Sequence, residues 1–460
     1  MFITVIQFLL SLSILVVLHE LGHFSAAKWF KTRVEKFYLF FNPGFSLFKK
    51  QIGETEYGIG WLPLGGYVKI SGMVDESFDM EQMESEPQPY EFRSKPAWQR
   101  LIIMIGGVFV NFVLGVLLFS MVLYVWGKDY IINDSLPEGI AVSEVGRELG
   151  LRDGDKIIKI DEVIFDRFSS GAFSKELVIN QAQNIYIERG GQPMTLPVNK
   201  EVVAKLTKYE NRNVQAVAPR HPYILANINE GTGAAEAGLQ VGDRILSVNG
   251  EATPYAHQFL EKMSAFQPVK KKLLQRLFGK KEPVKVLPNS VKITIDRRGT
   301  PIEKTVNLKN GKMGVNPKGL HNFVTIENES YTPGAALSAG WTRSITFITD
   351  QLKAFGHMFS GKIKAKDSLG SFITIGSMFG SDWDWQRFWS MTASLSLLLG
   401  FINLLPIPAL DGGYVMFLLF ESITGVKIPD RFMEIATLIG FFLLMGLMIF
   451  SFGLDLSRVI

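Results

Sequence analysis

FITVIQFLLSLSILVVLHELGHFSAA, residues 2–27, decides the fold class of this chain. The stretch contains no lysine or arginine, and it exceeds the roughly 20 residues that a helix needs to cross about 30 Å of hydrocarbon. Polar side chains are costly at that depth, so His19, Glu20 and His23 indicate a functional site. On a helix the two histidines lie one turn apart on one face. That spacing suits two imidazole ligands of one zinc ion, with Glu20 beside them as general base.

Three further apolar stretches predict a multi-pass α-helical membrane protein with four transmembrane helices. The four spans are expected at 1–27, 101–127, 388–420 and 435–455. A cleaved signal peptide is the alternative interpretation of the first stretch. It is disfavoured because the stretch has neither a basic start nor a small-residue cleavage site.

Basic residues predict the orientation of these spans. None precedes the first span, whereas basic side chains gather in the loops at 28–100 and 421–434. We therefore expect these two loops on the cytoplasmic side. Both termini and the large middle region would lie on the opposite side.

Composition excludes some classes of site from this 460-residue chain. Its hydrophobic content of 47% is concentrated toward the two ends. A net charge of +4 gives no argument for nucleic-acid binding, and the absence of cysteine excludes disulfides and thiolate metal ligands.

The first loop contains a segment, residues 57–72, that is apolar but too short to cross a membrane. Its aromatic and branched residues favour strands and its glycines favour turns, which predicts a β-hairpin or loop dipping toward the membrane. An exposed strand edge there, with Gly65, Gly66 and Tyr67, is a candidate partner for an extended substrate segment. The alternative is a hairpin that only packs against the spans.

The middle region contains an internal repeat: GLRDGDKIIKID, residues 150–161, aligns with GLQVGDRILSVN, residues 238–249. In each copy a G-L-x-x-G-D turn leads into an alternating strand. This pattern resembles bacterial PDZ domains and predicts two tandem PDZ-like α+β domains at 128–220 and 221–326, followed by connecting helices at 327–387. PDZ-like domains either capture a peptide end or block access by size. The basic insertion at 270–281 is interpreted as a lipid contact or a solvated excursion.

Two histidines do not complete a catalytic zinc site, which uses three protein ligands and a water. Cysteine is absent and the other histidines fall in the predicted outer region, so Asp411 is the remaining candidate. It follows Pro406 and Pro408, which lack N–H groups and interrupt the helix. That interruption would aim Asp411 inward.

HExxH in the first span, N-x-x-P-x-P-x-L-D-G in a later one, and PDZ-like domains between them resemble the site-2 protease family, in its bacterial sigma-E-regulating type. The resemblance implies that His19, His23 and Asp411 bind zinc and that Glu20 is the general base. The residues it implies in substrate binding are Asn403, Pro406, Pro408 and the strand-forming Gly65, Gly66 and Tyr67. It implies that Gly107 and Asn111, in the second span, lie near the active site.

The resemblance also implies an activity: hydrolysis of a peptide bond within or near the transmembrane segment of single-span membrane proteins, such as anti-sigma factors or remnant signal peptides. An upstream protease would trim these substrates, and the PDZ-like domains would filter or bind them. The expected location is the bacterial inner membrane, with the termini and PDZ-like domains in the periplasm. The rival interpretations are a metal transporter, which does not explain Glu20 beside His19, and a catalytically silent scaffold, against which the intact HExxH argues.

Overall fold

The computed structural model describes residues 2–73, 86–212, 214–267 and 288–459. Contacts between its elements divide the chain into two compact units. The first unit contains residues 1–127, 330–352 and 369–457, and the second contains residues 128–329, 353–368 and 458–460. The basic insertion at 270–281 lies outside the described residues.

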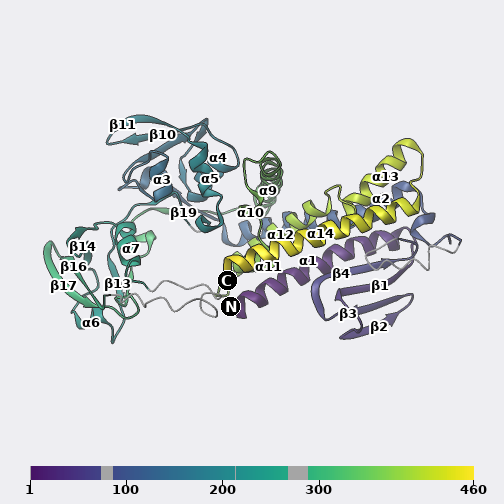
Figure 1. Ribbon diagram of the computed structural model, residues 1–460, viewed down its shortest axis with the longest axis horizontal. Helices are drawn as coiled ribbons and strands as arrows, with labels where there is room; N and C mark the ends of the chain where they lie inside the picture. The colour runs from purple at the N-terminus through teal and green to yellow at the C-terminus, as the bar shows by residue number, and fades with distance from the viewer. Residues whose placement is uncertain (1, 74–85, 213, 268–287, 460) are drawn as a thin grey trace. The chain divides into compact units, whose positions relative to one another are not determined.

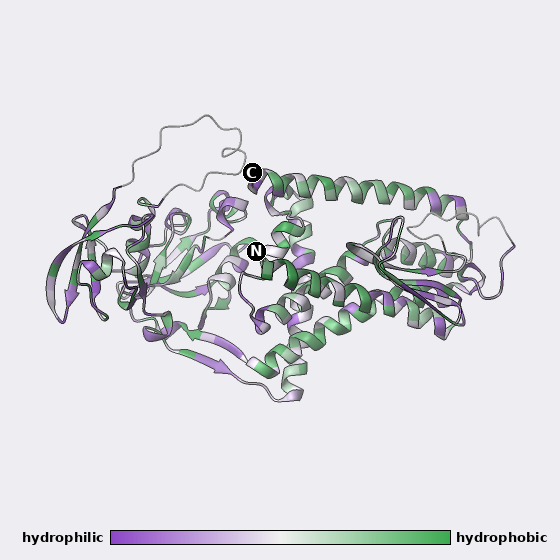
Figure 2. Cartoon of the chain, turned by 90° about the horizontal axis from the view of Figure 1, so that it is seen from below, coloured by the Kyte–Doolittle hydropathy of each residue, from purple (hydrophilic) through white to green (hydrophobic). Residues whose placement is uncertain are grey.

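Long apolar helices dominate the first unit (Figure 1). Among the described residues, three helices are long and apolar enough to cross a membrane: α1 (Phe2–Trp29), α2 (Ala97–Trp126) and, within α14 (Asp430–Val459), the stretch Arg431–Arg458. Figure 2 shows hydrophobic residues along most of their length. This composition supports the predicted multi-pass membrane protein.

The stretch predicted as the third span contains two helices rather than one. They are α12 (Trp385–Asn403) and α13 (Asp411–Thr424), and both pack against α2. Residues 404–410 separate them, where the two prolines predict an interruption, and Ala409 turns the backbone with a φ of 82°. Neither helix is among the three candidate membrane spans, so a fourth crossing stays a prediction.

The predicted connecting region contains α9 (Pro333–Phe359), α10 (Ala365–Ser368) and α11 (Phe372–Ser377). Asp455 of α14 ties α11 to that long helix. Its buried carboxylate accepts hydrogen bonds from the backbone N–H and hydroxyl groups of Ser371 and Thr374, at 2.6–3.1 Å. These bonds compensate the buried charge of Asp455, and they also give hydrogen-bond acceptors to N–H groups at the start of α11.

A four-stranded sheet follows α1 and extends the β region expected at 57–72. Its strands are β1 (Val34–Phe41), β2 (Phe48–Ile52), β3 (Thr55–Ile59) and β4 (Leu62–Ile70), in the order β2-β3-β1-β4. β1 runs parallel to β3 and antiparallel to β4, so β4 is an edge strand. β4 also packs against α1, which brings this edge beside the helix that carries the HExxH motif.

The second unit is built from two copies of one topology, each with its own hydrophobic core. One strand pair is β6 (Ile140–Val142) with β12 (Val217–Pro219), and its counterpart is β13 (Leu225–Ile228) with β18 (Val315–Pro317). The four-stranded sheet of the first copy contains, in spatial order, β11 (Gln192–Pro197), β10 (Asn184–Arg189), β7 (Lys156–Ile160) and β8 (Val163–Ile164). The matching order in the second copy is β17 (Thr300–Asn307), β16 (Ser290–Arg297), β14 (Arg244–Val248) and β15 (Glu251–Ala252). The sequence repeat is therefore a structural repeat, while its likeness to PDZ domains stays a prediction.

Helices occupy corresponding places in the two copies. α3 (Glu144–Glu148) and α4 (Ser170–Val178) of the first copy match α6 (Gly233–Glu236) and α7 (Ala256–Ser264) of the second. The first copy adds α5 (Lys200–Leu206). A separate sheet, in the order β19-β5-β9, joins β5 (Lys128–Ile132) to β9 (Arg167–Phe168) and to the late strand β19 (Ile326–Glu329).

Both copies use the last aspartate of the G-L-x-x-G-D turn in the same way. The buried Asp155 is held by Arg189, and the buried Asp243 by Arg297, through two hydrogen bonds of 2.7–2.8 Å in each case. Each arginine also donates to the carbonyl of the glycine that opens the turn. This Asp–Arg pair ties each turn to a strand of the four-stranded sheet.

Polar side chains join the two copies to one another. Asp153, in the turn of the first copy, accepts a hydrogen bond of 2.8 Å from His257 on α7. The hydroxyl of Tyr255 donates to Glu138 at 2.8 Å. The position equivalent to Asp153 in the second copy is Val241, whose side chain is 64% exposed.

Candidate metal centre

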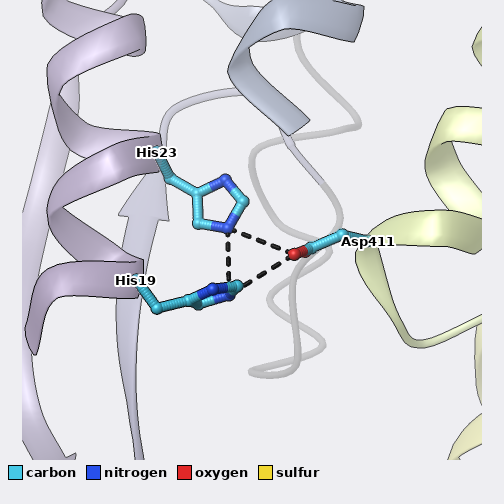
Figure 3. Close-up of side chains that lie close together, drawn as sticks. All are labelled: His19, His23 and Asp411. Carbon is cyan, nitrogen blue, oxygen red and sulfur yellow. Dashed lines mark hydrogen bonds and ion pairs between the residues drawn. The ribbon is translucent and has the colours of Figure 1, made fainter. Parts of the chain in front are cut away.

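His19, His23 and Asp411, from opposite ends of the chain, come together within the first unit (Figure 3). The Nε2 atoms of the two histidines are 3.3 Å apart. Oδ2 of Asp411 lies 3.4 Å from His19 Nε2 and 3.3 Å from His23 Nε2. Both histidines are buried and Asp411 is largely so. The three residues proposed as metal ligands therefore present one atom each to a common point.

This triangle has the dimensions of a zinc site. Four ligands in a tetrahedron at about 2.0–2.1 Å from one ion lie roughly 3.3–3.4 Å from each other. The three edges found here are 3.3, 3.3 and 3.4 Å. Oδ2 of Asp411 is buried and has no hydrogen-bond donor among the described residues, which is a costly arrangement unless a cation compensates it. The donor set thus fits zinc, with the fourth position left for water.

Hydrogen bonds orient the two imidazoles for this role. Nδ1 of His23 lies 2.8 Å from the carbonyl oxygen of Ile103, so Nδ1 carries the proton and Nε2 keeps its lone pair. The side-chain nitrogen of Asn403 lies 3.2 Å from His19 Nε2. A neutral imidazole has one N–H and one lone pair, so a His19 that binds a metal through Nε2 must carry its proton on Nδ1.

Asn111 completes the orientation of His19. It is fully buried on α2, and its amide nitrogen, Nδ2, lies 3.0 Å from His19 Nδ1. A lone pair on Nε2 places the imidazole proton on Nδ1. If the oxygen and nitrogen of this amide are exchanged, Oδ1, which has no hydrogen-bond partner among the described residues, accepts a hydrogen bond from the Nδ1–H group.

Glycines allow α2 to approach α1 closely enough for these contacts. A Cβ on Gly107 would lie 2.3 Å from His23 Nε2 and 2.6 Å from His19 Cε1. A Cβ on Gly22 would lie 2.3 Å from the carbonyl oxygen of Gly106, and one on Gly106 would lie 2.7 Å from that of Gly22. Real Cβ atoms essentially never come closer than 3.0 Å to such atoms, so a side chain at any of these positions would force an imidazole or a helix backbone to move.

Two of these supporting groups were missed by the sequence analysis. The Ile103 carbonyl belongs to the backbone and has no sequence signature. Gly106 does have one, because adjacent small residues in an apolar helix are typical of closely packed membrane helices.

The turn between α12 and α13 places Asp411. Asp411 is the first residue of α13, where a negative charge interacts favourably with the helix dipole. A Cβ on Gly412 would lie 2.2 Å from the Leu405 carbonyl oxygen, so the turn closes tightly against the helix start. Pro406 and Pro408 belong to this turn and shape it.

Glu20 lies beside the edge strand β4. A Cβ on Gly66 would lie 2.7 Å from Val16 Cγ1 and 3.6 Å from Glu20 Cγ. The glycine therefore lets the β4 backbone pass close to both residues. This places a strand edge next to the candidate general base.

The other two β4 residues singled out from the sequence pack within the sheet. A Cβ on Gly65 would lie 2.9 Å from the Phe41 ring. The ring of Tyr67 stacks on Tyr38, with centroids 5.2 Å apart, and its hydroxyl donates to Asn42 Oδ1 at 3.0 Å. The structure thus brings Gly66 to Glu20 and gives Gly65 and Tyr67 partners in the sheet.

Comparison with known proteins assigns the chain to a family. The model of peptidase family M50 matches residues 7–447. The chain belongs to this family. Protease RseP of Yersinia pestis is 28% identical over 481 residues, and the regulator of sigma-E protease RseP of Escherichia coli is 26% identical over 479, each covering 98% of both chains. A putative zinc metalloprotease of Neisseria meningitidis, NMA0084, is 26% identical over 471 residues and covers 99% of both.

Membership of family M50 makes the chain a metallopeptidase, with zinc as the cofactor. The site-2 protease resemblance predicted from the sequence is thereby confirmed. It favours a peptidase over the rival interpretations of a metal transporter and a silent scaffold.

Proposed function

We propose that this M50 peptidase hydrolyses a peptide bond within or near the transmembrane segment of single-span membrane proteins. The triangle of His19, His23 and Asp411 carries the proposal, because two of its corners lie on α1, a helix apolar enough to cross a bilayer. Relatives named as regulators of sigma-E protease support anti-sigma factors as one substrate class. Remnant signal peptides are a second proposed substrate class, because they too are single membrane-spanning segments.

His19, His23 and Asp411 would hold zinc, which when bound supplies a positive charge that polarises a water molecule and the scissile carbonyl. Glu20 would take a proton from that water and deliver it to the leaving amine. Asn403, whose amide reaches His19 Nε2, would donate to a carbonyl of the substrate. Asn111 and the Ile103 carbonyl would keep the imidazoles in the neutral tautomer that can act as a ligand.

The substrate would bind as an added strand on β4. A transmembrane helix bonds its own peptide groups internally, so its carbonyls are poorly exposed to attack until it unwinds. β4 is the edge of its sheet, and Gly66 brings its backbone close to Glu20. A substrate segment paired with this edge would regain backbone hydrogen bonds while its scissile bond lies near the base.

The remaining features fit a peptidase of the bacterial inner membrane. The basic loops at 28–100 and 421–434 support an orientation with the termini and the duplicated unit in the periplasm. There the two copies would act as PDZ-like domains that filter substrates by size or capture a trimmed end. An upstream protease would remove the large extracytoplasmic part of the substrate first.

Reconstitution in lipid vesicles with a tagged single-span substrate tests the proposal. We expect the wild type to cleave and a chelator to abolish cleavage. Glu20→Gln should keep zinc at full stoichiometry and lose hydrolysis, because it removes the base and no ligand. Glu54→Gln, an exposed carboxylate in the turn between β2 and β3, is the matched control and should keep both properties. Cleavage by Glu20→Gln, or metal transport without cleavage, would contradict the proposal.

A further inference from the structure

A buried ion pair joins α2 to the far end of the helix that carries Asp411. Arg100, in the first turn of α2, donates to Oε1 of Glu421, near the C-terminal end of α13. Nε of the same arginine donates to the Lys95 carbonyl at 2.9 Å, which fixes the guanidinium. The side chains of Arg100 and Glu421 are only 6% and 17% exposed. Neither residue belongs to the metal centre described above.

Glu421 lies on the same face of α13 as the candidate metal ligand. Asp411, Tyr414, Leu418 and Glu421 follow one another at intervals of three or four residues, the spacing of one helix face. Tyr414, Val415 and Leu418 are buried in a hydrophobic cluster with residues of α1 and α2. The ion pair therefore closes the C-terminal end of a packed face whose N-terminal end is Asp411.

We propose that Arg100 and Glu421 form a clamp that positions Asp411 for zinc binding; this inference rests on the proposed ligand role of Asp411. Apolar contacts are non-directional, so the cluster alone restrains rotation of α13 about its axis less than a charge-assisted hydrogen bond does. The carboxylate of Asp411 lies roughly 5 Å from that axis, so a rotation of about 20° moves it by roughly 2 Å. Zinc sites hold their ligand distances within about 0.2 Å.

Stability alone does not account for the clamp. Buried ion pairs can often be replaced by apolar side chains of similar volume without loss of stability. The free energy needed to remove two charges from water offsets much of the attraction between them. What the pair adds here is a fixed orientation of one helix on another. Arg100 and Glu421 are thus positioning residues that act through Asp411.

The test is zinc affinity, measured on the purified full-length protein by competition with a chelator. We expect Glu421→Gln and Arg100→Gln to weaken zinc binding roughly 10- to 100-fold, the range found when a supporting partner of a metal ligand is lost. The exchanged pair, Arg100→Glu with Glu421→Arg, should restore most of the affinity. Asp411→Asn is the reference for loss of the ligand itself.

Asp382→Asn is the matched control. Asp382 also pairs with an arginine of the first unit, Arg387, at 2.8 Å, but its side chain is 72% exposed. This variant should bind zinc as the wild type does. Cobalt substitution gives a second readout, because the visible spectrum of bound cobalt should shift in Glu421→Gln if the carboxylate of Asp411 is displaced.

The outcomes separate the clamp from the proposed function. Wild-type zinc affinity in Glu421→Gln, alongside weak binding in Asp411→Asn, would overturn the clamp and leave the ligand role intact. Wild-type affinity in Asp411→Asn would overturn the ligand role itself. A Glu421→Gln protein that melts earlier but binds zinc normally would make the pair merely structural. If the single variants fail to fold, the exchanged pair decides: restored affinity supports the clamp and weak affinity refutes it.

Discussion

Gly107 lies where α2 passes the two histidines, and a Cβ there would be 2.3 Å from His23 Nε2. That nitrogen is also the atom that faces Asp411, at 3.3 Å. A side chain at position 107 would therefore displace a candidate ligand atom rather than fill a gap. At the scale of the residue, the geometry of the candidate metal centre depends on glycine at position 107 as well as on the two imidazoles.

Gly107→Ala should abolish or strongly weaken zinc binding. The added methyl group can be accommodated only by moving an imidazole or separating α1 from α2, and either shift breaks the triangle. The measurement is zinc stoichiometry after dialysis. Gly446→Ala is the control, because a Cβ at that position of α14 has no atom of the described residues within 4 Å. Full zinc content in Gly107→Ala would show that the helices separate without cost to the site.

The proposed pairing with substrate depends on β4, and it would use the backbone groups of this strand. The strand is at the edge of the sheet, and a second edge, β2, lies at the far side of β3 and β1. β4 packs against α1, so its edge passes the candidate base. An element of this kind acts through N–H and carbonyl groups that side-chain substitutions leave in place.

Gly65→Pro should lower cleavage several-fold while zinc stays bound, because proline removes one backbone N–H from β4 and holds φ at about −65°, far from the 158° of Gly65. Gly65→Ala is the matched control. It brings a Cβ into the same contact with the Phe41 ring, 2.9 Å away, but keeps the N–H. Cleavage and zinc content are measured on both variants. Equal cleavage by the two would remove the strand-pairing idea.

Sequence patterns predicted those elements whose cause is local. The length and apolarity of α1 and α2, and the break before Asp411 at Pro406 and Pro408, follow from composition and from missing N–H groups. The parallel pairing of β1 with β3 could not be predicted, because residues 34–41 and 55–59 meet only through tertiary packing. The two prolines predicted an interruption in the expected third span. They did not predict the conformation of the turn or the separate helix that follows it.

The candidate site shows the same limit. The spacing of a helix turn made it possible to predict His19, Glu20 and His23 from the sequence. Asp411 could be predicted because the predicted spans contain few other residues able to bind a metal. The groups that orient them lie on α2, and one of them, the Ile103 carbonyl, carries no side-chain chemistry at all. Spacing within one helix predicts its own ligands, but not the backbone that supports them from another.

At the scale of the whole molecule, the duplicated unit depends on the Asp–Arg pair of each copy. In the second copy, burial by itself would raise the pKa of Asp243. The hydrogen bonds from Arg297 and from the Gln240 N–H outweigh burial and hold this pKa below its ordinary value. A carboxyl whose pKa is lower in the folded state contributes stability that is present above its unfolded pKa, about 3.9, and is lost as the pH falls through the folded pKa.

Acid should therefore loosen the second copy through Asp243. Amide hydrogen exchange of β14 and β16, measured from neutral pH down to about pH 3 and corrected with an unstructured peptide for the effect of pH on exchange itself, should show loss of protection below the ordinary carboxyl range. Asp243→Asn should lower protection at neutral pH and flatten this response. An unchanged acid response in Asp243→Asn would assign it to another group.

The two copies share their topology, down to the Asp–Arg pair. Asp153 joins the copies through His257, yet its counterpart in the second copy is the exposed Val241. The turn of the first copy therefore contributes to the junction through a side chain that the turn of the second copy lacks. The junction is therefore asymmetric, and a substitution at His257 would remove one of its hydrogen bonds without taking a residue from either hydrophobic core.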